Sequence, residues 1–314
     1  MLERLRDQTV LVTGASGFIG SRVLARLEEV PGARPIALAR KALAAGDDTA
    51  TVEASLADLS PAVWAEIGVE RIDCVLHLAG YVRKGPEPGP SYPTAYADSL
   101  IGTRALLESL PEPPRRFLLA STLDVYESPT EEARITESSP LRPLTVYSAS
   151  KLFLEAVVRE HAQVHGYEAA ALRVGHVYGP GEESYERLIP NTIRRLLRGE
   201  DAVLVGDPEN ERDLLYVDDA AEAWVRAAAA PDLPEVLNVV RGESVALGEV
   251  VQALARIAGG SVAIERTEPG SPGRSLRFDA SLMNSSLGTW PHVPLEEGLG
   301  RELEHMRVLA GSGT

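Results

Sequence analysis

Short apolar runs alternate with segments of helical periodicity along most of the chain. Residues 8–13 form an almost unbroken β-branched and aliphatic run, which predicts a buried strand. The predicted strands lie at residues 9–13, 35–39, 50–53, 73–78, 116–121, 169–174 and 236–240. Because helical patterns fill most of the intervals, the sequence predicts an α/β fold with a doubly wound parallel sheet.

The first predicted strand runs directly into a glycine-rich turn and then a helix. The turn contains Gly14, Gly17, Phe18, Ile19 and Gly20, with the spacing G-x-x-G-x-x-G. Glycines allow a tight turn and a close backbone approach, while the following helix N-terminus presents free N–H groups to a pyrophosphate. The alternative is a glycine turn without a ligand, but the strand–turn–helix context favours a dinucleotide site.

Tyr147 and Lys151 are spaced four residues apart at the start of an apolar helical run. They are therefore expected on one helix face. A cation beside a phenol favours the phenolate and lowers the tyrosine pKa, which lets the side chain donate or accept a proton near neutral pH. An incidental helix pair is the alternative for the two residues taken alone.

The chain resembles the extended branch of the short-chain dehydrogenase/reductase superfamily, the NAD(P)-dependent epimerase/dehydratase family acting on nucleotide sugars. Besides the glycine turn and the Tyr–Lys pair, the matching segments are residues 75–80, 119–126, 173–181, 212–219 and 287–299. The resemblance implies a Rossmann-like domain over residues 1–180, to which residues 212–240 return. It assigns residues 181–314 mainly to a smaller substrate-binding lobe.

The loop after the fourth predicted strand carries four prolines within residues 81–96. In doubly wound sheets, ligands bind beside the carboxyl ends of the strands. This loop is therefore a candidate substrate lid, and a rigid surface excursion is the alternative.

Composition indicates a cytoplasmic enzyme. The net charge of −15 disfavours sequence-independent binding to nucleic acid, and neither a membrane span nor a secretion signal is evident. Cys74 is the only cysteine and fits a buried strand better than a nucleophile. His161 and His165 lack further candidate ligands nearby, so no metal site is expected.

The end of the second predicted strand bears on cofactor choice. NAD-preferring enzymes place an acidic residue about 20 positions past the glycine turn, where this chain has Ala39. Arg40 and Lys41 follow and would attract a 2′-phosphate, so NADP(H) is favoured and NAD(H) remains possible. By resemblance, Ser55 and Leu56 lie at the adenine. The remaining cofactor contacts implied by the resemblance are Leu78, Ala79 and Gly80.

The resemblance also implies catalytic roles. Tyr147 would exchange a proton with the oxygen of the reacting carbon, and Lys151 would lower the tyrosine pKa and hold the nicotinamide ribose. Thr122 would hydrogen-bond the reacting oxygen. Ser121 competes for that role, but neighbouring strand residues point in opposite directions, so only one of them can face the site.

Substrate contacts follow from the same resemblance. His176 and Arg212 would lie near the substrate diphosphate, although His176 replaces the more usual Asn. Asp124 is the remaining member of an acidic pair that dehydratases carry directly after the threonine. Arg274 stands after Pro272-Gly273, where the family usually has an acid that holds the nucleotide ribose. This departure leaves a non-nucleotide ketone, aldehyde or alcohol open as substrate.

The expected reaction is NADPH-dependent reduction of a ketone on a nucleotide sugar, with a 4-keto-6-deoxyhexose as the leading substrate. Dehydration is disfavoured because the first acid of the pair is missing, and elimination needs an acid and a base besides Tyr147. Nucleotide-sugar epimerisation is the first alternative, and a non-catalytic dinucleotide sensor the second.

The family further suggests a homodimer paired through the helix of Tyr147. Its candidate contact residues, which could equally belong to the core, are Leu152, Phe153, Ala156 and Val157.

Overall fold

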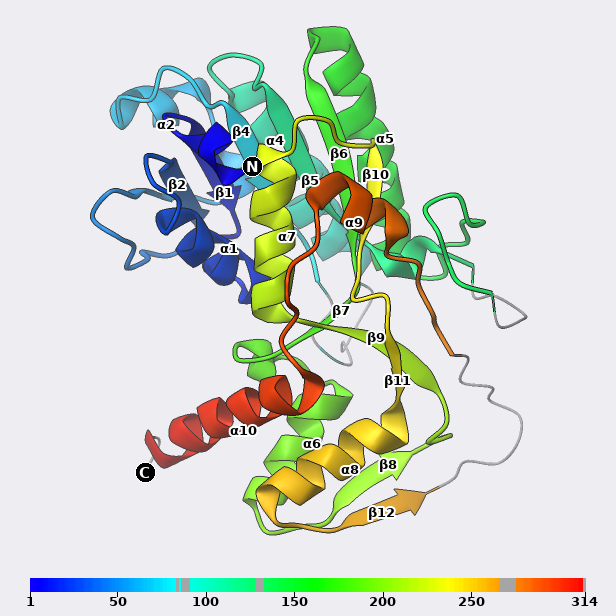
Figure 1. The fold of residues 1–314 in the computed structure, drawn as a ribbon. Helices are drawn as coiled ribbons and strands as arrows, with labels where there is room; N and C mark the ends of the chain where they lie inside the picture. Colours follow the sequence, from blue (N-terminus) through cyan, green and yellow to red (C-terminus); the bar gives the residue numbers. More distant parts are fainter. Residues whose placement is uncertain (83–84, 86–90, 128–132, 266–274, 313–314) are drawn as a thin grey trace.

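A seven-stranded parallel sheet forms the centre of the larger part of the molecule (Figure 1). The computed structural model describes residues 1–82, 85, 91–127, 133–265 and 275–312. The strand order is β10-β6-β5-β4-β1-β2-β3. In chain order these strands are β1 (Thr9–Thr13), β2 (Arg34–Ala39), β3 (Ala50–Glu53), β4 (Cys74–His77), β5 (Arg116–Thr122), β6 (Glu168–Val174) and β10 (Val236–Val239). All seven predicted strands are therefore confirmed, to within one residue at most ends.

Side-chain alternation along the strands divides the apolar residues between two helical layers. On one face, Val10 and Val12 join a cluster with α1 (Phe18–Glu28) and α7 (Val217–Ala229). On the other face, Leu11 joins a cluster that includes residues of α2 (Pro61–Glu66), α4 (Gly102–Ser109) and α5 (Val146–His165). Successive strand residues point to opposite faces, so a strand covered on both sides must be apolar throughout.

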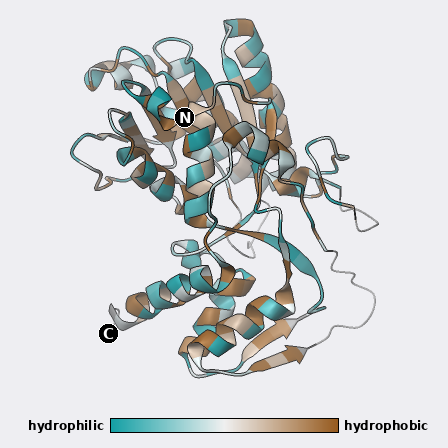
Figure 2. Ribbon diagram, in the orientation of Figure 1, coloured by the Kyte–Doolittle hydropathy of each residue, from teal (hydrophilic) through white to brown (hydrophobic). Residues whose placement is uncertain are grey.

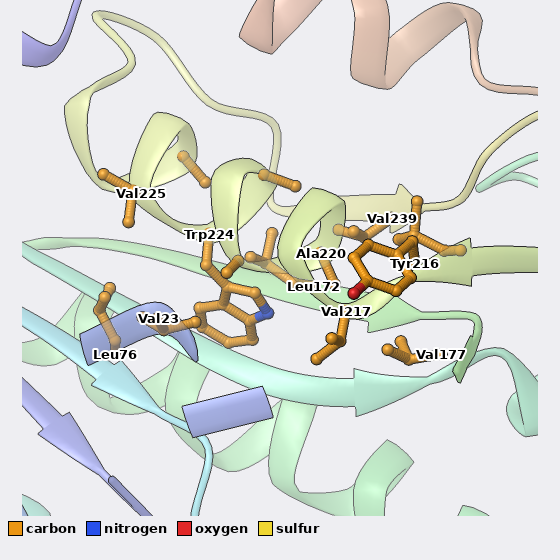
Figure 3. Packing of buried hydrophobic residues seen from close by; sticks show 14 of the residues in the cluster. Val23, Leu76, Leu172, Val177, Tyr216, Val217, Ala220, Trp224, Val225 and Val239 are labelled. Atoms are coloured by element: carbon orange, nitrogen blue, oxygen red, sulfur yellow. The ribbon is translucent and has the colours of Figure 1, made fainter. Parts of the chain in front are cut away.

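Trp224 of α7 is the largest side chain packed on the first of these faces (Figure 3). It is fully buried and lies in the same cluster as Leu76 of β4 and Leu172 of β6. Figure 2 shows the same division at the scale of the molecule, with hydrophobic residues along the central strands and hydrophilic ones on outer helix surfaces. Burial of large apolar side chains on both faces stabilises the sheet that carries the site.

Two smaller sheets lie below the main one in Figure 1. The first has the order β11-β9-β7, formed by β7 (His176–Tyr178), β9 (Glu211–Tyr216) and β11 (Ser244–Ala246). The second pairs β8 (Ala202–Val205) with β12 (Val262–Glu265). The helices of this part are α6 (Leu188–Leu197), α8 (Leu247–Ala258) and α10 (Leu295–Ser312). In contrast, α9 (Ser281–Leu287) packs near α7 and β10.

Residues 212–240 return to the main sheet only in part. Most of this segment forms α7 and β10, which belong to the larger part. Its first residues belong to β9, which pairs with β7 and β11 instead. The division into a dinucleotide-binding domain and a substrate lobe concerns ligands, and it stays a proposal.

Candidate functional site

The carboxyl ends of the central strands open into a cavity of about 1470 Å³. This is the edge at which doubly wound sheets bind ligands. The cavity is lined by most of the residues that the sequence singled out: Gly14, Gly17, Phe18, Ile19, Gly20, Arg40, Ser55, Leu56, Leu78, Ala79, Gly80, Ser121, Thr122, Asp124, Tyr147, Lys151 and His176. Lys41 and Arg212 are not part of this lining, and Arg274 lies outside the described residues.

Two glycines of the turn admit no side chain. Gly14 has φ 68°, and a Cβ there would lie 2.9 Å from the backbone nitrogen of Ala79. A Cβ on Gly20 would lie 2.1 Å from the carbonyl oxygen of Gly14. Gly17 is the N-cap of α1, and no side chain caps that helix end. The first N–H groups of α1 therefore remain available to an anionic ligand in the cavity.

A buried histidine anchors the end of β4 beside the turn. The His77 ring contacts Thr13 Oγ1 at 2.7 Å through Nδ1 and Thr103 Oγ1 at 2.9 Å through Nε2. Thr13 Oγ1 also accepts the N–H of Ala79 at 3.1 Å. Burial lowers the pKa of His77 to about 3, so the ring is neutral. His77 thereby fixes the cavity-lining backbone, a role that its place in an apolar strand did not reveal.

The N-terminal cap of α5 sets the position of Tyr147. Thr145 Oγ1 accepts the backbone N–H of Ser148 at 3.1 Å, and the Ser148 hydroxyl contacts the N–H of Thr145 in return. This reciprocal cap holds the first helical turn, which contains Tyr147. Lys151 follows one turn later and is 2% exposed, with Nζ 6.0 Å from the centroid of the Tyr147 ring.

The electrostatics of this pair differ from the expectation. Burial raises the pKa of Tyr147 to about 12, and the charge of Asp124 adds to the rise, while a hydrogen bond with Thr122 opposes it. The expected lowering of the Tyr147 pKa by Lys151 is therefore wrong for this structure. The physical reason is the burial of the phenol, which is the largest cause of the raised pKa. Burial also lowers the pKa of Lys151 itself to about 8.

Thr122 and Ser121, at the end of β5, take different partners. Thr122 interacts with Tyr147, and its Oγ1 accepts the N–H of Asp124 at 3.2 Å. Ser121 donates its hydroxyl proton to Glu155 Oε1 on α5. Of the two residues, Thr122 therefore contacts Tyr147, and its catalytic role stays a prediction. The substrate contact expected of the Ser121 hydroxyl is not supported, because that hydroxyl is bound to a carboxylate.

Charged groups gather around His176 on β7. Burial lowers the pKa of His176 to about 4, Asp124 opposes this shift, and Arg212 and Arg187 add to it. Burial likewise lowers the pKa of Arg212, and Asp124 opposes that shift too. Asp124, His176 and Arg212 are thus close enough to influence one another electrostatically, and their contacts with substrate stay predictions. The sequence reasoning missed Arg187, which lies in the cavity lining.

Arg187 is held by its local surroundings. Its guanidinium lies 4.5 Å from the centroid of the Tyr185 ring, and its Nη1 is 3.4 Å from Glu182 Oε1. It precedes α6 as the N-cap residue. In the sequence it stands among glutamates in a polar stretch, where nothing distinguishes it from a solvated surface charge.

Arg40 follows β2 directly, at the same end of the cavity as the glycine turn. Its side chain is 78% exposed, and Nη1 lies 4.0 Å from Asp98 Oδ2. Asp98 also lines the cavity. An exposed guanidinium with one distant counter-ion is available to a phosphate group.

The residues that the structure describes contain no group of three or more His, Cys, Asp or Glu residues arranged to hold a metal ion. They also contain no helix that is long and apolar enough to cross a membrane. The cytoplasmic location stays a prediction.

Residues 10–240 match the model of the "NAD dependent epimerase/dehydratase family". A dTDP-glucose 4,6-dehydratase from Xanthomonas campestris pv. campestris is 31% identical over 332 residues, covering 94% of this chain and 92% of that protein. A trifunctional UDP-glucose 4,6-dehydratase/UDP-4-keto-6-deoxy-D-glucose 3,5-epimerase/UDP-4-keto-L-rhamnose-reductase from Arabidopsis thaliana is 27% identical over 95% of this chain. This chain spans 47% of the length of that protein.

Among solved structures, RMD from Pseudomonas aeruginosa complexed with NADPH matches with a TM-score of 0.79 at 26% sequence identity. The match covers 96% of this chain and 99% of that chain. The family match spans most of the chain and includes the glycine turn, Thr122, Tyr147 and Lys151. The chain therefore belongs to the NAD dependent epimerase/dehydratase family of enzymes that modify nucleotide sugars.

Proposed function

We propose that the protein is an NADPH-dependent reductase of a ketone on a nucleotide sugar, with a 4-keto-6-deoxyhexose as the sugar class. The observation that carries this proposal is Arg40, which lines the cavity immediately after Ala39 at the end of β2. A net reduction consumes its cofactor, and a cation at this place favours the phosphorylated form.

The turn after β5 supports reduction over dehydration. Leu123 stands where dehydratases carry the first acid of their pair, is 5% exposed and packs in a cluster with Val125 and Phe278. An acid at this position would have to leave that apolar contact. Elimination across two carbons needs an acid and a base in addition to Tyr147, and the turn after β5 supplies Asp124 without the acid that precedes it in dehydratases.

The proposed step assigns one task to each residue of the catalytic trio. Bound NADPH would supply hydride to the carbonyl carbon. Tyr147 would donate its phenolic proton to the carbonyl oxygen, and Thr122 would hydrogen-bond the same oxygen. Burial raises the pKa of Tyr147 to about 12, so at neutral pH the phenol carries the proton that this step transfers. Lys151, buried beside Gly80, would hold the nicotinamide ribose.

Epimerisation with retained NAD is the second candidate. Asp98 favours it, because this carboxylate lies 4.0 Å from Arg40 and can neutralise the charge that would attract a 2′-phosphate. To separate the two candidates, the protein is incubated with NADPH and a panel of nucleotide 4-keto sugars while absorbance of the reduced cofactor is followed. We expect substrate-dependent loss of NADPH. Sugar isomerisation without net loss of NADPH would contradict the reductase assignment.

We also propose that the protein forms a homodimer through α5. On this helix Phe153 is 56% exposed and Ala156 is also exposed, and Tyr96 of the adjacent η3 (Ala95–Ile101) is 58% exposed. Leu152 and Val157, the other two candidates, pack instead against the core. Exposed aromatic side chains on adjacent helices support a contact surface.

A further inference from the structure

A buried ion pair lies directly behind the catalytic end of β5. Arg173 on β6 contacts Glu155 on α5 at two points, with Nη2 2.7 Å from Oε2 and Nε 3.0 Å from Oε1. The two residues are 3% and 7% exposed. Two parallel contacts between a guanidinium and a carboxylate fix distance and orientation together. The pair therefore ties α5 to the sheet at one defined position.

Further hydrogen bonds extend this pair to other elements. Glu155 accepts the Ser121 hydroxyl of β5, while Arg173 Nη1 donates to the Tyr126 hydroxyl at 2.8 Å. Tyr126 in turn donates to Asn238 Oδ1 on β10 at 2.7 Å. All five side chains are buried. The network thus joins α5, three strands and the chain that follows Thr122.

On both α5 and β5, a residue of this network lies close in the chain to a proposed catalytic residue. Tyr147, Lys151 and Glu155 are spaced four residues apart on α5, so they lie along one helix face. Ser121, the partner of Glu155, immediately precedes Thr122. A displacement of α5 along β5 would therefore change the distance between Thr122 and Tyr147.

Stability alone does not explain a buried charge pair well. Replacement of buried ion pairs by apolar residues of similar volume is often neutral or stabilising, because desolvation offsets the Coulomb attraction. Removal of one partner alone is strongly destabilising, since the other charge remains buried. A role in orientation therefore deserves a direct test.

We propose that Glu155, with Arg173, is a positioning residue that holds α5 in register with β5, so that Tyr147, Lys151 and Thr122 converge. This inference rests on the proposed function, in which Tyr147 is the proton donor and Lys151 holds the cofactor ribose. Neither Glu155 nor Arg173 acts on the substrate directly.

The test compares single and paired replacements. Glu155→Met and Arg173→Met alone should each lower the melting temperature by roughly 5–10 °C, because each leaves a buried charge unpaired. The combined variant removes both charges, so its melting temperature should recover to near that of the unmodified protein. Its kcat for NADPH-dependent reduction of a nucleotide 4-keto-6-deoxyhexose should nevertheless stay about 10- to 100-fold low, the cost of a misplacement near 1 Å.

Two readouts separate positioning from stability. In the combined variant, NADPH affinity measured by cofactor fluorescence well below the melting temperature should fall with kcat, because Lys151 shifts with the helix. Glu168→Gln is the matched control. It weakens the Arg116–Glu168 ion pair, which joins β5 and β6 at their first residues, the ends of these strands far from Thr122. This control should change melting temperature without changing kcat or NADPH affinity.

Failure of the positioning role can be distinguished from failure of the proposed function. If the combined variant regains both kcat and NADPH affinity together with its melting temperature, the network is structural only and the positioning role is wrong. Tyr147→Phe is measured in parallel. An active Tyr147→Phe variant would overturn the acid/base assignment and the positioning role with it. An inactive one, beside a combined variant that binds NADPH weakly, would support both.

Discussion

Tyr147 carries the chemistry of the proposed reaction, and its hydroxyl is the only part of the side chain that the reaction uses. Tyr147→Phe removes the transferable proton and keeps the ring, so turnover should fall by about 10²–10⁴-fold. The change should leave the fold intact, because it keeps the aromatic ring and removes only the hydroxyl, which hydrogen-bonds with Thr122. Steady-state kinetics with circular dichroism as the folding control measure this. Near-normal turnover would eliminate Tyr147 as the proton donor.

Arg40 is the residue on which the proposed preference for NADPH rests. If its guanidinium binds the 2′-phosphate, NADPH should bind more tightly than NADH by roughly 1–3 kcal/mol, which is about 5- to 150-fold in affinity. Arg40→Ala should remove most of this difference, and the double change with Lys41→Ala should remove any compensation. Asp98→Asn is the complementary change, because it removes the negative charge of the carboxylate beside Arg40. Equal affinity for both cofactors in the unmodified protein would be incompatible with the assignment.

Individual site residues were predictable from the sequence when a short stretch of the chain was enough to indicate their chemistry. The glycine turn and the Tyr147–Lys151 spacing are short patterns with a physical reason, and both line the cavity. His77 and Glu155 were not found, because each acquires its role from partners far away in the chain. Arg187 was not found because it stands in a polar stretch, like many surface charges. The pKa of Tyr147 was misjudged for a related reason, since burial depends on the whole fold.

At the level of elements, α10 contacts η5 (Glu182–Ser184), with His305 Nε2 3.5 Å from Glu183 Oε2, and buried carboxyl groups of the two elements influence each other. Glu302 is fully buried, and burial together with the charge of Glu182 raises its pKa to about 9. Burial raises the pKa of Glu182 to about 7, although Arg187 opposes this. Because η5 leads into the cavity-lining residues 183–187, this contact supports one wall of the site.

This contact predicts a pH-dependent stability. Carboxyl groups whose folded pKa lies above the usual 4.5 bind protons more tightly in the folded protein. Their stabilising effect is complete below about pH 4.5 and is lost as the pH rises through about 7 and then 9. Glu302→Gln should therefore raise stability by roughly 1–3 kcal/mol at pH 9 and flatten the decline. Differential scanning fluorimetry from pH 5 to 9 tests this.

The control for that prediction is Glu304→Gln, a change of an exposed glutamate on the same helix. Its stability profile should follow that of the unmodified protein. A Glu302→Gln profile that declines as steeply as the control would refute the role assigned to the buried carboxyl pair.

The elements themselves were predictable to different extents. Most of the seven strands are apolar runs because both of their faces are covered. The edge strand β3 has one buried residue, Val52, and was found as well. The short strands β7, β9 and β11 were not predicted. They pair across segments far apart in the chain and lack a strong apolar pattern of their own. The expected return of residues 212–240 was therefore only partly right.

At the scale of the whole molecule, the exposed aromatic residues on α5 and η3 predict association. Phe153→Glu should convert the proposed homodimer into a monomer at micromolar concentration, because it places a charge in an apolar contact. Val164→Glu, on the exposed end of the same helix, serves as a comparison. Multi-angle light scattering gives the mass of each. An unmodified protein that is monomeric under these conditions would rule out the homodimer.

Transfer of hydride from NADPH to the sugar is the reaction proposed for the whole molecule. The most direct measurement uses NADPH that carries deuterium at the transferred position of the nicotinamide, with a nucleotide 4-keto-6-deoxyhexose as the partner. We expect one NADP⁺ for each product molecule, with deuterium retained on the former carbonyl carbon, and neither result with Tyr147→Phe. Conversion of the sugar without formation of NADP⁺ would contradict the account and would make epimerisation with bound cofactor the better assignment.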